Sequence, residues 1–159
     1  MKSLLLAMAT LAILTGCQST KPTPASINQQ AVLTGSLPYN PLAWRAVTSW
    51  TNPQQQSMST LYGNDIAVGY ARSHADSSYP SGAILALVTW SQRDDPHWFG
   101  ARIPSSPRSV EFVSISSTTD QPVYQLFSGE SLQPATNVDA ATAAKRIEYL
   151  LSQRASVMP

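Results

Sequence analysis

The chain has 159 residues, with ten Lys and Arg against nine Asp and Glu, and a formal net charge of +1. This length suits one domain that can bury a sizeable core. The nearly balanced charge provides no net positive field for nucleic acid or for an anionic membrane surface.

The first residues have the layout of an export signal. Lys2 gives a basic start, an apolar stretch runs from Leu4 to Leu14, and the small residues Thr15 and Gly16 lead into Cys17. An apolar stretch of about 11 residues fits a signal peptide and is short of the roughly 20 residues that span a bilayer. The junction resembles the lipobox of bacterial lipoproteins, in which the cysteine receives a lipid and becomes the new N-terminus. An ordinary signal peptide that happens to contain a cysteine is the alternative.

On this interpretation the chain has three parts: residues 1–16 are a lipoprotein signal peptide, residues 17–36 are the lipidated N-terminus with a flexible tether, and residues 37–159 are the domain. Cys17 is the only cysteine, so none remains for a disulfide. Gln18 follows it in place of the aspartate that commonly retains proteobacterial lipoproteins in the inner membrane. The resemblance therefore implies a lipid-anchored protein of the outer membrane, on its periplasmic side.

Short strands and one helix are expected in the first half of the domain. Residues Met58–Tyr62 can form a strand, and Gly63-Asn64-Asp65 provides a turn with a helix N-cap. The helix that follows would bury one apolar stripe, made of Ile66, Ala67, Tyr70 and Ala71. Residues Ala83–Trp90 are apolar on both alternating faces, which is typical of a central strand covered on both sides.

The second half is expected to contain two strands and a final helix. The strand Ser109–Ile115 places Glu111 on one face with Val113 and Ile115, and either face could be the core. Val123–Phe127 is another strand. Asn137 to about Gln153 has helical spacing of apolar residues, with Thr136 or Asn137 as the cap. Together the elements predict an α+β fold, mainly an antiparallel sheet of about five strands flanked by two helices.

Few residues can carry chemistry. The sequence has two histidines, His74 and His97, which excludes most multi-histidine metal sites, and the turn Asp94–His97 is favoured as a solvated loop over a metal site. No nucleophile elbow, phosphate-binding loop or dinucleotide-binding glycine pattern is present.

Several motifs resemble, in order and spacing, the cytochrome P460 family. They are Leu61-Tyr62-Gly63-Asn64-Asp65-Ile66-Ala67, Tyr79-Pro80-Ser81-Gly82-Ala83-Ile84-Leu85, Trp90 with Asp95-Pro96-His97-Trp98, and Val110-Glu111-Phe112. The resemblance covers roughly residues 40 to 130. It implies a mostly antiparallel sheet with short helices and an apolar pocket for a c-type haem, and the cytochrome P460 proteins themselves oxidise hydroxylamine.

The chain departs from this family at two places that matter for haem. It has no Cys-x-x-Cys-His, and the position of the lysine that cross-links the haem falls at about Leu87. The resemblance then implies either a small ligand or a non-covalently held haem in an apolar pocket. His97 is the candidate axial ligand, although a structural role in its loop is favoured. Trp90 is a candidate residue of the pocket lining. Glu111 is a candidate proton relay, with a surface glutamate as the alternative. The alternative is a structural or interaction lipoprotein with a filled pocket and no cofactor.

Overall fold

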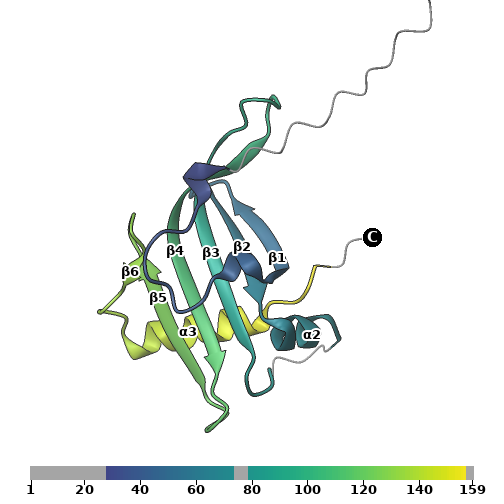
Figure 1. Cartoon of the computed structure of the whole chain (residues 1–159), viewed down its shortest axis with the longest axis vertical. Helices are drawn as coiled ribbons and strands as arrows, with labels where there is room; N and C mark the ends of the chain where they lie inside the picture. Colours follow the sequence, from purple (N-terminus) through teal and green to yellow (C-terminus); the bar gives the residue numbers. More distant parts are fainter. Residues whose placement is uncertain (1–27, 74–78, 157–159) are drawn as a thin grey trace, which may run out of the picture.

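A six-stranded antiparallel sheet forms the centre of the protein, and its strands follow one another in chain order from β1 to β6 (Figure 1). The computed structural model describes residues 28–73 and 79–156. The strands are β1 (Arg45–Asn52), β2 (Ser57–Gly63), β3 (Ile84–Asp94), β4 (Arg102–Ile115), β5 (Pro122–Ser128) and β6 (Gln133–Pro134). The helices are α2 (Asp65–Ser73) and α3 (Ala140–Ser152), with short 3-10 turns η2 (Gln29–Ala31) and η3 (Pro41–Ala43). The predicted α+β class is confirmed.

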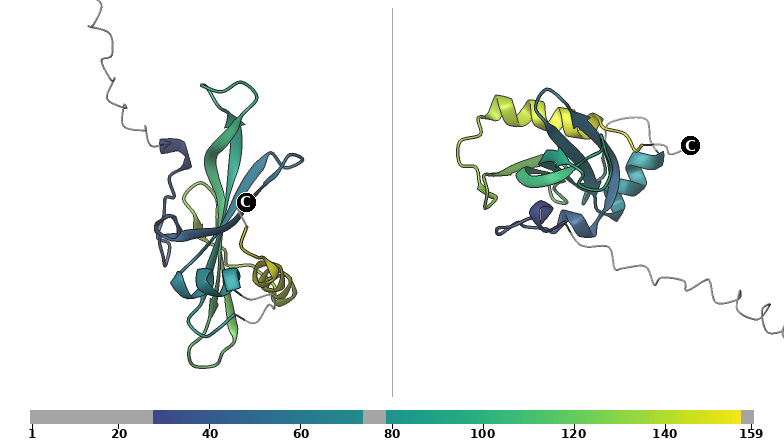
Figure 2. Two further views of the ribbon diagram at one scale, coloured as in Figure 1. Left: turned by 90° about the vertical axis from the view of Figure 1, so that its right-hand side faces the viewer. Right: turned by 90° about the horizontal axis from the view of Figure 1, so that it is seen from above.

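Two layers cover the sheet, one on each face (Figure 2). On one side, α2 and α3 pack against a core that includes Leu61, Leu85 and Val113. On the other side, the chain from residue 28 to residue 44 crosses a second core that includes Val88 and Phe112. Because both faces are covered, β3 is apolar on both, as its sequence predicts.

The N-terminal segment 28–36, which the sequence assigns to the tether, lies on the sheet in this structure. Ala31 and Leu33 pack against the second core, and the indole nitrogen of Trp90 donates a hydrogen bond to the carbonyl of Ala31 at 2.9 Å. A buried indole N–H needs an acceptor, and this segment provides it. Residues 1–27, with the expected signal peptide and Cys17, lie outside the described residues.

Helix α2 begins where the sequence predicts, because Asn64 ties it to β3. The Oδ1 atom of Asn64 accepts from the backbone N–H of Ala67 at 3.0 Å and of Ile84 at 3.2 Å, and its Nδ2 donates to the carbonyl of Gly82 at 2.9 Å. The expected apolar stripe is partly wrong: Ala67, Val68 and Ala71 are buried, whereas Ile66 is 47% exposed.

Other elements also differ from the sequence prediction, since β3 runs on to Asp94 and β4 begins already at Arg102. Strand β1 was not expected, because it is an edge strand on which Val47 alone is buried and the alternation is therefore weak. Helix α3 starts at Ala140, and its cap is Asp139, not Thr136 or Asn137. The Asp139 carboxylate accepts from the backbone N–H of Thr142 at 2.8 Å and from its hydroxyl at 2.7 Å, which fixes the first turn. Within the described ranges, none of the helices has the length and apolar character needed to cross a bilayer.

Candidate functional site

Glu111 lies in the second half of β4, on the face of the sheet that α3 covers. Its partners across the sheet are Leu87 of β3 and Leu126 of β5. The residue is only 7% exposed. A carboxylate at such a position is costly unless other groups satisfy its charge and its hydrogen bonds.

Arg146 and Tyr124 meet that need. Arg146 of α3 donates from Nε to Oε2 of Glu111 at 2.7 Å and from Nη2 to Oε1 at 2.8 Å, a bidentate pair. The Tyr124 hydroxyl of β5 donates to Oε2 at 2.7 Å. Bidentate arginine–carboxylate pairs fix geometry as well as charge, so this pair holds α3 in register with the sheet.

The pKa values of the two partners reflect the same contacts. Hydrogen bonding to Glu111 raises the pKa of the Arg146 guanidinium above its ordinary value, and burial opposes this effect. Burial, and then the hydrogen bond to Glu111, raise the pKa of the Tyr124 phenol above its ordinary 10.0. Arg146 therefore stays a cation and Tyr124 a donor throughout the physiological pH range.

A cavity of about 300 Å³ opens beside this ion pair. Its lining is mostly polar and comes from β1 to β4, the β1–β2 turn and α3. The lining residues are Trp50, Asn52, Gln55, Ser57, Ser59, Leu87, Thr89, Ser109, Glu111, Arg146 and Tyr149. The sequence predicts an apolar pocket, but this cavity is mostly polar. On the face of the sheet that α3 covers, Leu61 of β2 and Leu87 of β3 are followed, towards the cavity, by serine in β2 and threonine in β3.

Two aromatic rings form one wall of the cavity. Trp50 and Tyr149 pack edge to face with their ring centroids 6.2 Å apart, at an interplanar angle of 84°. The guanidinium carbon of Arg146 lies 4.8 Å from the Tyr149 centroid, within cation–π range. Arg146 thus touches both the carboxylate and the aromatic wall.

The structure does not bring the other predicted site residues to this cavity. Trp90 alternates with Leu87 along β3 and points into the opposite core, so it lies on the other face of the sheet from Glu111. His97 lies in the β3–β4 turn, where its backbone N–H donates to Oδ1 of Asp95 at 2.8 Å and its side chain is exposed. It lines a separate surface depression with Asp95 and Ile103. Their proposed roles towards a cofactor stay predictions, and His74 lies outside the described residues.

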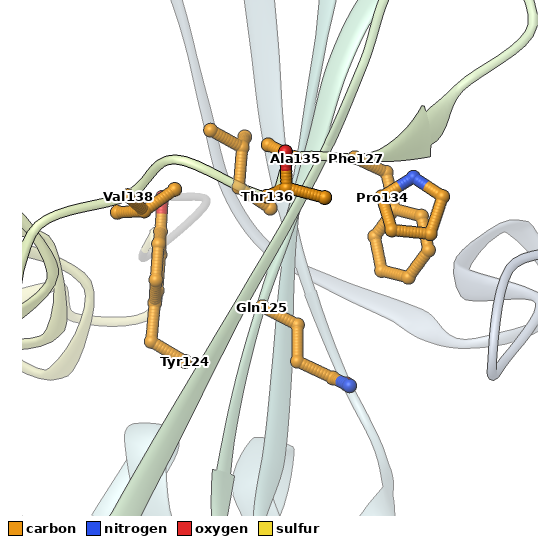
Figure 3. A pocket seen from close by; sticks show the side chains of 8 residues that line it. Tyr124, Gln125, Phe127, Pro134, Ala135, Thr136 and Val138 are labelled. Carbon is orange, nitrogen blue, oxygen red and sulfur yellow. The ribbon is translucent and has the colours of Figure 1, made fainter.

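A further depression of about 270 Å³ follows the outer edge of the sheet, between β5 and the segment 134–138 (Figure 3). Tyr124 and Val138 stand at one end of it and Phe127 and Pro134 at the other. Tyr124 is its one ionisable side chain, and the hydroxyl of that residue is already engaged by Glu111. This depression therefore has few side-chain groups that could bind a ligand specifically or react with it.

Sequence reasoning found Glu111 but missed Arg146, Tyr124 and Tyr149. One signal was present: Arg146 stands three residues after Ala143 and four before Leu150, so a cation occupies the apolar side of the final helix. A cation at such a position points to a buried anion opposite it. Nothing in the sequence identified Glu111 as that anion, because the pairing spans 35 residues.

The model of one protein family, cytochrome P460, matches residues 39–145, more than half of the chain. The chain belongs to the cytochrome P460 family. The match includes Leu87 and Glu111 and ends one residue before Arg146. None of the curated proteins compared with the chain matches it.

The cavity of this cytochrome P460 domain does not fit a haem group. Haem iron is held in proteins by His, Cys, Met or Tyr. The cavity lining has no His, Cys or Met, and its tyrosine, Tyr149, has its ring packed between Arg146 and Trp50. The volume is at the lower end of the roughly 300–1,000 Å³ found for small-molecule pockets. Within residues 28–73 and 79–156, no group of three or more His, Cys, Asp or Glu side chains could hold a metal ion either.

Proposed function

We propose that this protein is a lipoprotein of the bacterial cell envelope whose cytochrome P460 domain binds a small, neutral, polar molecule without haem. The observation that carries the proposal is the Glu111–Arg146 ion pair at the wall of a polar cavity of about 300 Å³. The cavity lies beside Leu87 and Glu111, the positions at which the family resemblance implies the haem pocket.

The charges of the site favour a neutral ligand. Glu111 and Arg146 neutralise each other, so neither an anion nor a cation finds an unpaired opposite charge there. Among the described residues, no hydrogen bond engages Nη1 of Arg146, whose side chain is 34% exposed. That nitrogen can donate to a hydroxyl or carbonyl group of a ligand.

The remaining lining suits a molecule with several hydroxyl or amide groups. Asn52, Gln55 and the serine and threonine hydroxyls offer both donors and acceptors. Trp50 and Tyr149 offer an apolar surface for the less polar side of such a molecule. A few placed polar groups beside an aromatic wall are what orient a small ligand.

Binding is tested by calorimetric titration with a panel of neutral probes, namely monosaccharides, polyols and small amides. Gln55 lines the cavity on an exposed turn, and Gln54 beside it does not, so Gln54→Ala is the matched control for Gln55→Ala. We expect at least one probe to bind, with a severalfold loss in Gln55→Ala and none in Gln54→Ala. Binding by no probe, or equal binding by both variants, contradicts the proposal and favours a structural module without a ligand.

Haem is tested separately, by absorbance of the protein as isolated and during haem titration. We expect no saturable Soret shift. A saturable shift that disappears in His97→Ala would instead support a histidine-ligated haem outside the Glu111 cavity.

The lipid anchor on Cys17 is part of the same proposal, supported by the export signal and lipobox-like junction. Labelling of growing cells with palmitate should mark the chain, and Cys17→Ser should abolish the label. Membrane fractionation should recover the wild-type chain with the outer membrane. If Cys17→Ser retained the label, this result would contradict the lipid anchor on Cys17 but would leave the ligand proposal unaffected.

A further inference from the structure

The β3–β4 turn exposes two adjacent aromatic side chains at one end of the molecule. Trp98 is 72% exposed and Phe99 is 109% exposed, whereas the next most exposed large apolar side chain in the described ranges, Val123, is 50% exposed. Single exposed apolar residues are ordinary, but an aromatic pair that is mostly exposed leaves a large apolar area in contact with water, which is unfavourable unless a partner covers it. The pair therefore points to a partner outside the chain.

Backbone hydrogen bonds define the conformation of the turn that carries these side chains. The backbone N–H of Ala101 donates to the carbonyl of Trp98, and the N–H of Asp95 donates to the carbonyl of Ala101, both at 3.0 Å. Gly100 has φ of +77°, which a residue with a side chain rarely adopts. The tight turn thus places Phe99 near its apex, projecting from the domain.

The start of the described chain lies at the base of the same hairpin (Figures 1 and 2). The Nδ2 atom of Asn28 donates to the carbonyl of Pro104 of β4 at 2.7 Å. Trp98 is six residues from Pro104, so it lies at most about 20 Å from that residue. Cys17 precedes Asn28 by eleven positions in the sequence, and even a fully extended chain of that length spans no more than about 40 Å.

We propose that Trp98 and Phe99 insert into the surface of the lipid bilayer that carries the anchor on Cys17, so that the β3–β4 end of the domain faces the membrane. Tryptophan suits this position because its ring is apolar and its N–H reaches the wet headgroup region. The flanking charges balance, with Arg93 and Arg102 against Asp94 and Asp95, so apolar burial drives the contact. Because of this contact, the domain that contains the Glu111 cavity keeps a fixed orientation relative to the bilayer.

This inference rests on the proposed lipid anchor, and the experiment separates the two. The mature chain, purified from membranes, is reconstituted into phosphatidylcholine vesicles with brominated acyl chains, which quench nearby tryptophans. Trp98→Phe shows how much of the quenching belongs to Trp98 among the four tryptophans. Phe99→Ser weakens insertion while Trp98 still reports, and Val123→Ser, an exposed apolar residue at the start of β5, is the matched control.

We expect quenching in the wild type that Trp98→Phe abolishes, that Phe99→Ser reduces severalfold, and that Val123→Ser and high salt leave unchanged. Quenching that persists in Trp98→Phe, or that Phe99→Ser does not alter, overturns the inference. The mass of the Cys17 peptide reports acylation independently. A chain without acyl groups contradicts the anchor, and the same quenching measurement with vesicles in excess still decides whether the turn binds lipid.

Discussion

Replacing Arg146 by methionine removes the cation that satisfies Glu111 while keeping most of the apolar stem of the side chain. Breaking a buried ion pair by removing one partner costs about 3–5 kcal/mol, because an uncompensated charge remains buried. Glu111 is 7% exposed, but the Arg146 side chain is 34% exposed and water can enter the cavity beside it. We therefore expect a loss near the lower limit, about 3 kcal/mol of the free energy of unfolding.

The measurement is urea denaturation at neutral pH, followed by circular dichroism, for a double-mutant cycle. Glu111→Gln keeps an acceptor for Tyr124 but removes the charge, so adding it to Arg146→Met should recover about 2 kcal/mol of the loss. The double variant should accordingly be more stable than Arg146→Met alone. A cycle with no coupling would mean that the two side chains do not depend on each other.

The surface ion pair Arg45–Asp65 is the matched control. Its N–O distance is 2.9 Å, close to the 2.7 Å of Arg146–Glu111, but its side chains are 56% and 94% exposed. Exposed pairs contribute about 0–1 kcal/mol, so Arg45→Met should change stability by no more than that. Equal losses of stability in Arg45→Met and Arg146→Met would refute the claim that burial makes the Glu111–Arg146 pair contribute more to stability than an exposed pair.

Three further predictions concern the helix caps and the buried phenol. Asn64→Ala should cost about 2 kcal/mol in urea denaturation, because it removes the α2 cap and leaves the N–H of Ala67 without its acceptor. The hydrogen bonds that Asp139 accepts lower the pKa of its carboxyl group. The contribution of this carboxylate to stability is therefore complete above pH 3.8, the ordinary pKa, and is lost as the pH falls through the lower pKa of the folded protein. Asp139→Ala should thus lower the urea midpoint at neutral pH and match the wild type in acid, and an equal deficit at both would contradict this cause. The pKa of Tyr124 is raised above 10.0, so its stabilising effect is complete below pH 10.0 and declines above it. Tyr124→Phe should therefore lose less stability than the wild type when the pH rises past 10.0, and an equal loss of stability in the two proteins would argue against a buried, Glu111-bound phenol.

Local patterns in the sequence determined most of the secondary structure. The apolar run of β3 predicts a strand covered on both faces, and the Asn64 cap marks the start of α2, because backbone hydrogen bonds and side-chain spacing act over a few residues. Strand β1 and the start of α3 were missed, since an edge strand needs little apolar alternation and several polar residues before α3 could each have served as its cap.

The composition of the site was decided by the tertiary structure. The sequence placed Glu111 on a strand face but left open which face was buried, and both faces turned out to be covered. The side chains that satisfy it come from β5 and from α3, 13 and 35 residues further along the chain. Such a pairing follows from how the helix packs across the sheet, which spacing along the chain does not encode. The sequence alone singled out Glu111 as a candidate, whereas the tertiary structure decided that it is buried and, through the packing of α3, supplied the arginine that makes the pocket polar and charge-balanced.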